Sequence, residues 1–235
     1  MAKKIYLSPS DQNRNTYKVG NTNEAAQCSA IADLCVVALK RCGFEAKTNK
    51  KDDMYDRVRE SNEWGADAHI PIHTNAFDGS VAGFRGFYHT ANGQGHKLVA
   101  AIMKAVAPIT PGESDNLSAY PGLYEVRASD APCAYLELGF HDNATEARYI
   151  IDHKKDLAEA ICKGVCNYFG VKYVSPAKEE KEPEKEPEKV TQKLYRVFNS
   201  EGKQTGAYSV EANAFNELRK QLKNGGSAKI TYGAK

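Results

Sequence analysis

The stretch Asp67-Ala68-His69-Ile70-Pro71-Ile72-His73-Thr74-Asn75-Ala76 decides the fold class of the first part of the chain. Its apolar centre favours an extended segment over a helix, and in a strand His69 and His73 lie roughly 13 Å apart at about 3.3 Å per residue. They cannot share one metal ion. His73 stands at the strand end and is the better candidate ligand, whereas we expect His69 to be a packed or hydrogen-bonded histidine.

Strand and helix patterns alternate on both sides of this stretch. The predicted strands cover residues 4–7, 44–48, 67–73, 83–89 and 133–138, and the predicted helices cover 24–41, 52–64, 95–107 and 144–169. Strands that alternate with helices of this length predict a layered α/β domain. Because ligands of open α/β sheets bind beyond the carboxyl ends of the strands, the residues that end strands are the candidates for a functional site.

The composition is that of an ordinary globular chain. The 235 residues are 41% hydrophobic and 26% charged, and the formal net charge is +2. No window approaches the roughly 18 consecutive apolar residues of a membrane helix, and the apolar run at residues 5–7 is too short for a secretory signal peptide. We therefore expect synthesis in the cytoplasm without a signal peptide, and no membrane partner.

Charge divides the chain into three segments. Residues 175–192 alternate Lys, Glu and Pro with a single large aliphatic residue, so no core can form there and the segment is predicted to be an extended linker. The formal charge is −1 over residues 1–174, −2 over the linker and +5 over residues 193–235. The basic excess therefore lies in the last segment.

Residues 193–235 are predicted to form a small module of ββαβ type. A hairpin of residues 194–198 and 206–210 is followed by a helix at 212–223 and a strand at 228–232. Its charge suits an anionic polymer such as teichoic acid. Aromatic residues interleaved with the basic ones give weak support to nucleic acid as the alternative partner, which we do not favour. A structural or dimerising role stays open.

All six cysteines lie in the first segment, at positions 28, 35, 42, 133, 162 and 166. The first three recur every seventh residue and the last two are four residues apart, so each set can share one helix face as small buried hydrophobic side chains. The spacing is not the CxxC type of a zinc knuckle. We expect buried thiols and no disulfides.

Two glutamates occupy positions that suggest chemistry. Glu137 lies in an otherwise apolar strand, where a carboxylate is costly to bury unless it is paired or catalytic. Glu24 opens the first long helix, where a helix-dipole or capping role is the simpler interpretation.

These residues occur in a recognisable order. The sequence contains Ser8-Pro9-Ser10, Glu24, Arg57, His73-Thr74-Asn75-Ala76, Gly83 and Pro132-Cys-Ala-Tyr-Leu-Glu137-Leu-Gly139-Phe140-His-Asp-Asn143. Over about residues 3–169 it resembles the zinc-dependent N-acetylmuramoyl-L-alanine amidases of Amidase_3 type. That family cleaves the amide between muramic acid and the peptide stem of peptidoglycan. The resemblance implies a mixed, mostly parallel sheet flanked by helices.

The resemblance also implies roles for individual residues. The family's zinc is held by two histidines and a glutamate, which makes His73 the second histidine ligand, Glu24 the glutamate ligand and Glu137 the catalytic acid and base. The family's first histidine is missing. A gapless count places Asp11 at its position, and a slip of one residue places Gln12 there. We lean to Gln12, because the opening resembles the Ser-Pro-Ser-x-Gln of phage-related amidases, which vary the residue before the glutamine more freely.

Three further polar residues are candidates for substrate binding. Asn75 follows the histidine ligand, Arg85 is placed to contact a stem-peptide carboxylate, and His141 could line the cleft. The sequence thus predicts a peptidoglycan amidase of endolysin type, made inside the cell and acting on the wall after release. The missing histidine leaves one alternative, a catalytically inactive wall-binding protein.

Overall fold

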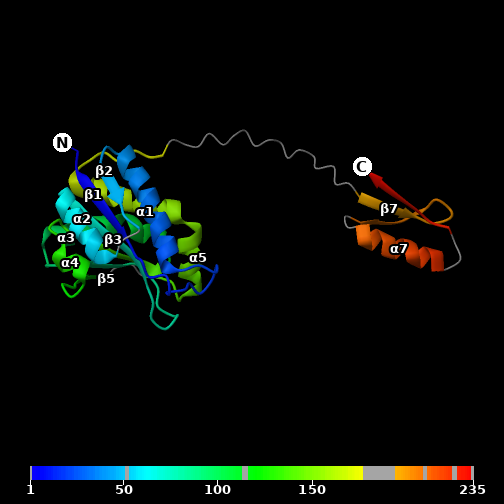
Figure 1. Cartoon of the computed structure of the whole chain (residues 1–235), viewed down its shortest axis with the longest axis horizontal. Helices are drawn as coiled ribbons and strands as arrows, with labels where there is room; N and C mark the ends of the chain where they lie inside the picture. The colour runs from blue at the N-terminus through cyan, green and yellow to red at the C-terminus, as the bar shows by residue number, and fades with distance from the viewer. Residues whose placement is uncertain are drawn as a thin grey trace. The chain divides into compact units, whose positions relative to one another are not determined.

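The chain divides into two compact units. The computed structural model describes residues 2–50, 53–112, 116–176, 194–208, 211–223 and 227–233. The first unit comprises residues 1–177 and the second residues 178–235. Figure 1 shows the elements of each unit, which we describe separately. Most of the predicted linker, from residue 177 on, lies outside the described residues.

A six-stranded sheet forms the centre of the first unit. Its strands are β1 (Lys4–Pro9), β2 (Glu45–Thr48), β3 (Ala68–Asn75), β4 (Arg85–Tyr88), β5 (Asn116–Ala119) and β6 (Tyr135–Phe140), in the order β2-β1-β3-β6-β4-β5. The pairs β1–β2, β1–β3, β3–β6 and β4–β5 are parallel, and only the β4–β6 pair is antiparallel. The expected mixed, mostly parallel sheet is confirmed.

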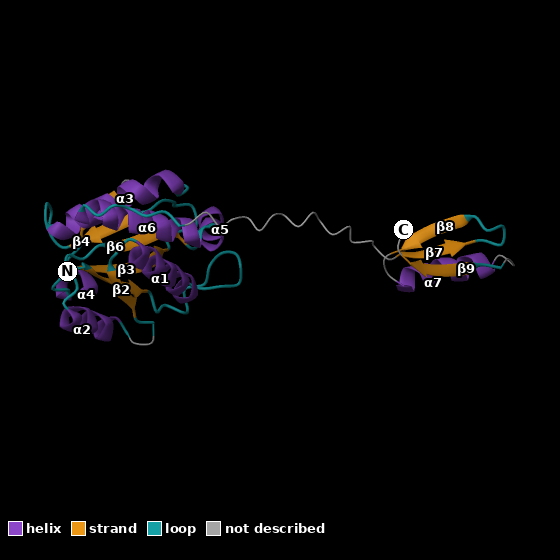
Figure 2. Ribbon diagram, turned by 90° about the horizontal axis from the view of Figure 1, so that it is seen from above, coloured by secondary structure: helices purple, strands orange, loops and turns teal. Residues whose placement is uncertain are grey.

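Helices cover both faces of this sheet. They are α1 (Glu24–Arg41), α2 (Met54–Trp64), α3 (Gln94–Val106), α4 (Tyr124–Ala128), α5 (Ala144–Asp152) and α6 (Lys154–Phe169), with a 3₁₀ turn at Ala107–Ile109. Buried residues of α1, α3 and α6 join those of the sheet in one large apolar cluster. Helices α2 and α4 contact each other, and Figure 2 shows them side by side.

The alternation of strand β1 explains which face each helix covers. Successive side chains of a strand point to opposite faces of the sheet. Ile5 and Leu7 accordingly belong to the apolar cluster with α1, whereas Tyr6 packs edge-on against Trp64 of α2. Ser8, on the same face as Tyr6, accepts a hydrogen bond from Arg57 of α2. Tyr6 and Ser8 therefore lie on the face of the sheet that α2 and α4 cover.

Local signals fix the ends of α1 and α2. The side chain of Asn23 accepts a hydrogen bond from Ala26 N and caps α1, so Glu24 becomes its first residue. Asp53 caps α2 in the same way, and Gly65 ends it in the left-handed conformation that glycine adopts without strain. These caps place the start of α1 at the carboxyl ends of the parallel strands.

The structure differs from the sequence expectation in two places. The single helix expected at 144–169 is two helices, because α5 ends at Asp152 and His153 serves as the cap between it and α6. Strand β5 and helix α4 were not predicted. Both are too short, at 4 and 5 residues, to show a periodicity in the sequence.

The second unit has the predicted ββαβ order. It consists of β7 (Leu194–Phe198), β8 (Gln204–Tyr208), α7 (Glu211–Lys223) and β9 (Lys229–Gly233). Its sheet has the order β8-β7-β9, and both pairings are antiparallel. Val197 and Ala214 are buried between the sheet and the helix. Across the described residues of both units, no helix is long and apolar enough to cross a membrane.

Candidate active site

The fold brings Glu24, His73 and Glu137 together at the carboxyl ends of the parallel strands. His73 of β3 is the register partner of Glu137 on the adjacent strand β6, so their side chains share a face. Glu24 Oε1 lies 3.0 Å from His73 Nδ1. All three predicted residues of the centre therefore meet, although they come from α1, β3 and β6.

Glu24 is held in a fixed orientation. Asn15 Nδ2 donates to Glu24 Oε2 over 2.7 Å, and the backbone N–H of Thr74 donates to Oε1 over 3.3 Å. Burial raises the pKa of this carboxyl, but the contacts with His73 and the hydrogen bond from Asn15 outweigh it and leave the pKa below the ordinary value. Glu24 is thus an ionised carboxylate directed at His73.

His73 lies between carboxylates. Its Nε2 is 3.8 Å from Glu125 Oε2, on the ring edge away from Glu24, and has no hydrogen-bond partner among the described residues. Tyr135 stacks on the ring with a centroid separation of 4.6 Å. Burial lowers the pKa of His73, but Glu125, Glu24 and Glu137 together raise it to about 9. The surrounding negative charge therefore favours a cation at this position.

Glu137 has the opposite electrostatic character. Its Oε2 is buried without a hydrogen-bond partner among the described residues. Burial raises the pKa of this carboxyl to about 8; His73 opposes the shift and Glu24 adds to it. A carboxyl group that can hold or release a proton near neutral pH is suited to general acid and base catalysis.

The loop after β1 supplies the two candidates for the altered ligand position. Gln12 Oε1 accepts a hydrogen bond of 2.7 Å from Asn15, the residue that also donates to Glu24. The carboxylate of Asp11 instead forms an ion pair of 3.4 Å with Arg57. Both residues line a cavity of about 330 Å³ together with His73 and Tyr135. The structure connects Gln12, and not Asp11, to Glu24.

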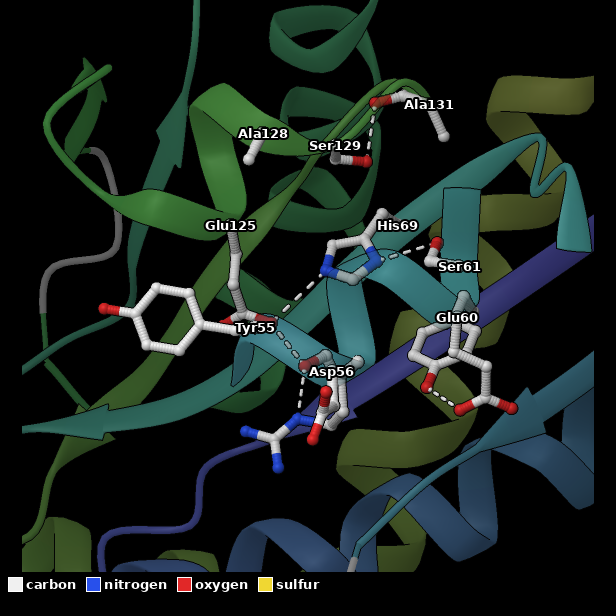
Figure 3. A network of polar contacts seen from close by, with 12 residues as sticks. Tyr55, Asp56, Glu60, Ser61, His69, Glu125, Ala128, Ser129 and Ala131 are labelled. Atoms are coloured by element: carbon white, nitrogen blue, oxygen red, sulfur yellow. Dashed lines mark hydrogen bonds and ion pairs between the residues drawn. The ribbon is translucent and has the colours of Figure 1, made fainter. Parts of the chain in front are cut away.

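Sequence reasoning missed Glu125, which belongs to the short helix α4. Its Oε1 accepts a hydrogen bond from the Ser8 hydroxyl and lies 3.3 Å from His69 Nε2. Figure 3 shows Glu125 facing His69, whose Nδ1 is 3.0 Å from Ser61 Oγ. Burial raises the pKa of Glu125, but His69, His73 and Ser8 lower it to about 2. Glu125 is therefore a second ionised carboxylate beside His73.

One sequence signal could have indicated Glu125. It stands between Tyr124 and Val126 in a short apolar segment, as Glu137 does in its strand. The structure adds the reason for its position: the guanidinium of Arg57 is buried and needs an acidic or hydrogen-bonding environment. Its Nε donates to Ser8 over 2.9 Å, and Ser8 in turn donates to Glu125. His69 is the hydrogen-bonded histidine that its position in the strand predicted.

The predicted substrate-binding residues divide between two places. Asn75 and Arg85 line a second cavity of about 280 Å³ with Phe77 and Phe140. His141 is buried; its Nδ1 lies 3.1 Å from Thr74 Oγ1, and its ring stacks on Tyr17. It lines neither of these two cavities.

Comparison with known proteins identifies the protein family to which the chain belongs. Residues 8–167 match the family model described as Amidase_3, N-acetylmuramoyl-L-alanine amidase. The chain therefore belongs to the N-acetylmuramoyl-L-alanine amidase family, as the resemblance of its motifs indicated.

Individual relatives agree with this assignment. The chain is 26% identical over 126 residues to the germination-specific N-acetylmuramoyl-L-alanine amidase of Bacillus subtilis, covering 52% of this chain and 53% of that protein. It is 28% identical over 176 residues to the probable cell wall amidase LytH of Staphylococcus epidermidis, covering 71% of this chain and 58% of that protein. The chain thus spans between half and three fifths of the length of these curated relatives.

Solved structures show the same fold. The N-acetylmuramoyl-L-alanine amidase AmiC2 of Nostoc punctiforme superimposes with a TM-score of 0.65 at 18% identity, covering 72% of this chain and 97% of that chain. The catalytic domain of the amidase CwlV of Paenibacillus polymyxa gives 0.63 at 21% identity, covering 72% and 99%. The catalytic domain of the CD27L endolysin, which targets Clostridia difficile, gives 0.60 at 17% identity, covering 70% and 97%.

The two buried glutamates are expected to affect stability in opposite directions. A carboxyl whose pKa rises on folding to about 8 costs free energy that grows as pH rises from about 4.5 to 8, so Glu137→Gln should stabilise the metal-free protein at pH 7 by up to about 3 kcal/mol. Glu125, with a pKa lowered to about 2, stabilises the fold above its unfolded pKa. Glu125→Gln should therefore destabilise the protein at pH 7, and the difference should shrink as pH falls.

Thermal melts of both variants in chelator measure these effects, between pH 4 and 8 for Glu137→Gln and between about pH 2 and 7 for Glu125→Gln. The two substitutions are matched, since each replaces one buried carboxylate by its amide. A Glu137→Gln protein that melts well below the wild type at pH 7 would contradict the electrostatic description of the site.

Proposed function

We propose that the chain hydrolyses the amide bond between N-acetylmuramic acid and the L-alanine of the stem peptide of peptidoglycan. The observation that carries the proposal is the buried Glu137 carboxyl, with an unpartnered oxygen, beside the Glu24–His73 pair. Membership of the amidase family supports the choice of bond. The relatives that the chain matches are described as amidases of the same bond or of the cell wall.

Glu24 and His73 supply two of the ligands that a zinc ion needs. Two ligands of one tetrahedral ion are about 3.3 Å apart, given ligand bonds of about 2.0–2.1 Å, and the 3.0 Å between Glu24 Oε1 and His73 Nδ1 is close to this separation. Among the described residues, no third Asp, Glu, His or Cys has a ligand atom within 4.8 Å of both. The amide oxygen of Gln12, linked through Asn15 to Glu24, is the remaining donor. We therefore assign Glu24, His73 and Gln12 as the residues that hold the metal.

A bound zinc ion supplies Lewis acidity, which activates a water molecule and polarises the amide carbonyl. The side chains of the protein carry out the proton transfers. In its ionised form Glu137 would take a proton from the attacking water at its unpartnered Oε2, and the raised pKa would then hold that proton on the carboxyl. The same oxygen then donates the proton to the amide nitrogen as the amine of L-alanine departs.

Glu125 and Tyr135 orient the His73 imidazole as a metal ligand. Tyr135 stacks on the imidazole and fixes its plane, and Glu125 lies on the Nε2 side. Nδ1 donates to the Glu24 carboxylate in the metal-free protein; where a metal ion replaces that proton, a carboxylate on the Nε2 side would keep the other ring proton on Nε2. The buried hydrogen bonds of Glu125 with Ser8 and His69 hold the carboxylate in place.

The remaining parts of the proposal concern substrate, setting and the second unit. Asn75 and Arg85 line one cavity, where the guanidinium would bind a stem-peptide carboxylate. We propose that the protein is an endolysin that acts on the wall after release from the cell in which it is made. Residues 193–235, with a formal charge of +5, would bind anionic wall polymers.

Amide hydrolysis is tested on purified peptidoglycan. The wild type should release peptides with a free L-alanine amino terminus and create no new reducing sugar ends. Glu137→Gln should lower the rate by a factor of 10² or more, the usual contribution of a general acid and base, while the exposed Glu63→Gln should match the wild type. Chelation should abolish the activity and zinc should restore it. No release by the wild type would sink the enzyme proposal in favour of a wall-binding protein.

The ligand assignment predicts different effects at two neighbouring positions. Gln12→Ala should weaken zinc binding tenfold or more, and Gln12→His should strengthen it, because imidazole is a better zinc ligand than an amide oxygen. Asp11→Ala removes only the ion pair with Arg57. Because the aspartate side chain is 50% exposed, zinc affinity should not change. Competition with a coloured chelator measures all three. If Asp11→Ala lost more zinc affinity than Gln12→Ala, Asp11 and not Gln12 would be the metal ligand.

The role of the second unit is tested by sedimentation with cell walls. The full chain should bind walls that carry teichoic acid, release from them as salt rises, and bind poorly to walls stripped of the polymer. A chain ending at Val174 should sediment less with the intact walls. Equal binding of the two chains would refute the anchor role.

A further inference from the structure

Three cysteines far apart in the sequence meet at the end of the first unit opposite to Glu24. Cys42 is the C-cap residue of α1, while Cys162 and Cys166 lie one turn apart on α6. Their sulfur atoms all lie within 4.8 Å of one another, and the Cys42 and Cys162 sulfurs are 3.6 Å apart. All three side chains are buried.

This spacing is that of thiolates around one tetrahedral metal ion. A zinc–sulfur bond of about 2.3 Å gives a sulfur–sulfur edge of about 3.8 Å. The separation of 3.6 Å between the Cys42 and Cys162 sulfurs is close to that edge. The Cys166 sulfur lies within 4.8 Å of both, so it would have to move by at most about 1 Å to bind the same ion. Cys28, Cys35 and Cys133, which are equally buried, do not belong to such a group among the described residues.

The chain that follows α6 adds polar groups to the cluster. The backbone N–H of Val174 donates to Cys42 Sγ over 3.3 Å, a contact that favours sulfur as a thiolate. The Cys42 thiol donates to the carbonyl oxygen of Val174 over 3.7 Å, and the same oxygen accepts a hydrogen bond of 2.9 Å from Arg41 Nε, whose guanidinium is paired with Glu159. A donor to sulfur, an adjacent guanidinium and a nearby carbonyl oxygen are features that a purely apolar packing of thiols does not need.

We propose that Cys42, Cys162 and Cys166 bind one thiophilic divalent metal ion of the zinc type. Binding releases the three thiol protons to solvent and forms three metal–thiolate bonds, with the fourth position filled by a water or by the Val174 carbonyl oxygen. Because binding releases these protons, the affinity should rise with pH.

The site is separate from the proposed catalytic centre. Glu24 begins α1 and Cys42 caps its other end, and a helix of 18 residues is about 27 Å long. The metal would join the end of α1, α6 and the segment ending at Val174, which is where the chain leaves the apolar cluster of the first unit. Its role would be to fasten this segment, independently of hydrolysis.

Cadmium titration of the metal-free full-length chain tests the proposal, because thiolate-to-cadmium charge-transfer absorption in the ultraviolet reports sulfur ligands only. His73→Ala removes the imidazole ligand of the other site and should leave this absorption unchanged. We expect one saturable equivalent in the wild type and in the matched control Cys35→Ser, which alters another buried thiol of α1. Cys162→Ser and Cys42→Ala should reduce the cadmium affinity tenfold or more.

A second measurement keeps the proposal falsifiable where a cysteine variant fails to fold. In the His73→Ala protein, stoichiometric zinc should raise the melting temperature and slow proteolysis after Val174. Absence of the charge-transfer band in the wild type would overturn the proposal. So would a band of equal strength in Cys162→Ser, or a disulfide between Cys42 and Cys162 in non-reducing peptide maps. None of these outcomes depends on amidase activity.

Discussion

The contact between the His73 imidazole and the Glu24 carboxylate, 3.0 Å long, is the constraint around which the first unit is organised. It requires the end of β3 to meet the start of α1. The Asn23 cap fixes where α1 begins, and the parallel β1–β3 pair places the strand end beside it. The register between β3 and β6 then adds Glu137. The cap is local, whereas the two strand pairings join residues far apart in the sequence, and together they position three groups from three elements.

Three carboxylates surround one imidazole, and their environments separate their roles. Glu24 and Glu125 accept hydrogen bonds and stay ionised, whereas burial holds the proton on Glu137. A site with two fixed negative charges and one exchangeable proton is suited to a cation and to proton transfer, the two requirements of metal-assisted amide hydrolysis. The unpartnered oxygen of the buried Glu137 carboxyl destabilises the fold, and the same oxygen is the atom that proton transfer needs.

The sequence predicted the residues whose positions follow from element ends. His73 ends a strand and Glu137 interrupts an apolar strand, so both were visible without the fold. Glu24 starts a helix, where its pattern suggested a cap, and the family resemblance alone implied that it is a ligand. Glu125 was not visible, because α4 is five residues long and its contacts with Ser8 and His69 join positions 117 and 56 residues apart. The cysteine cluster was hidden for the same reason. The seven-residue spacing correctly indicated burial, but Cys42 meets Cys162 across 120 residues.

The central claim is that one metal ion sits between Glu24 and His73 with Glu137 beside it. Anomalous X-ray diffraction at the zinc absorption edge, from crystals of the full chain grown with zinc, tests it most directly. The account predicts an anomalous peak within bonding distance of a Glu24 oxygen, His73 Nδ1 and the Gln12 amide oxygen. Zinc found only on His73 Nε2, or no peak near either residue in crystals that hold zinc elsewhere, would contradict it.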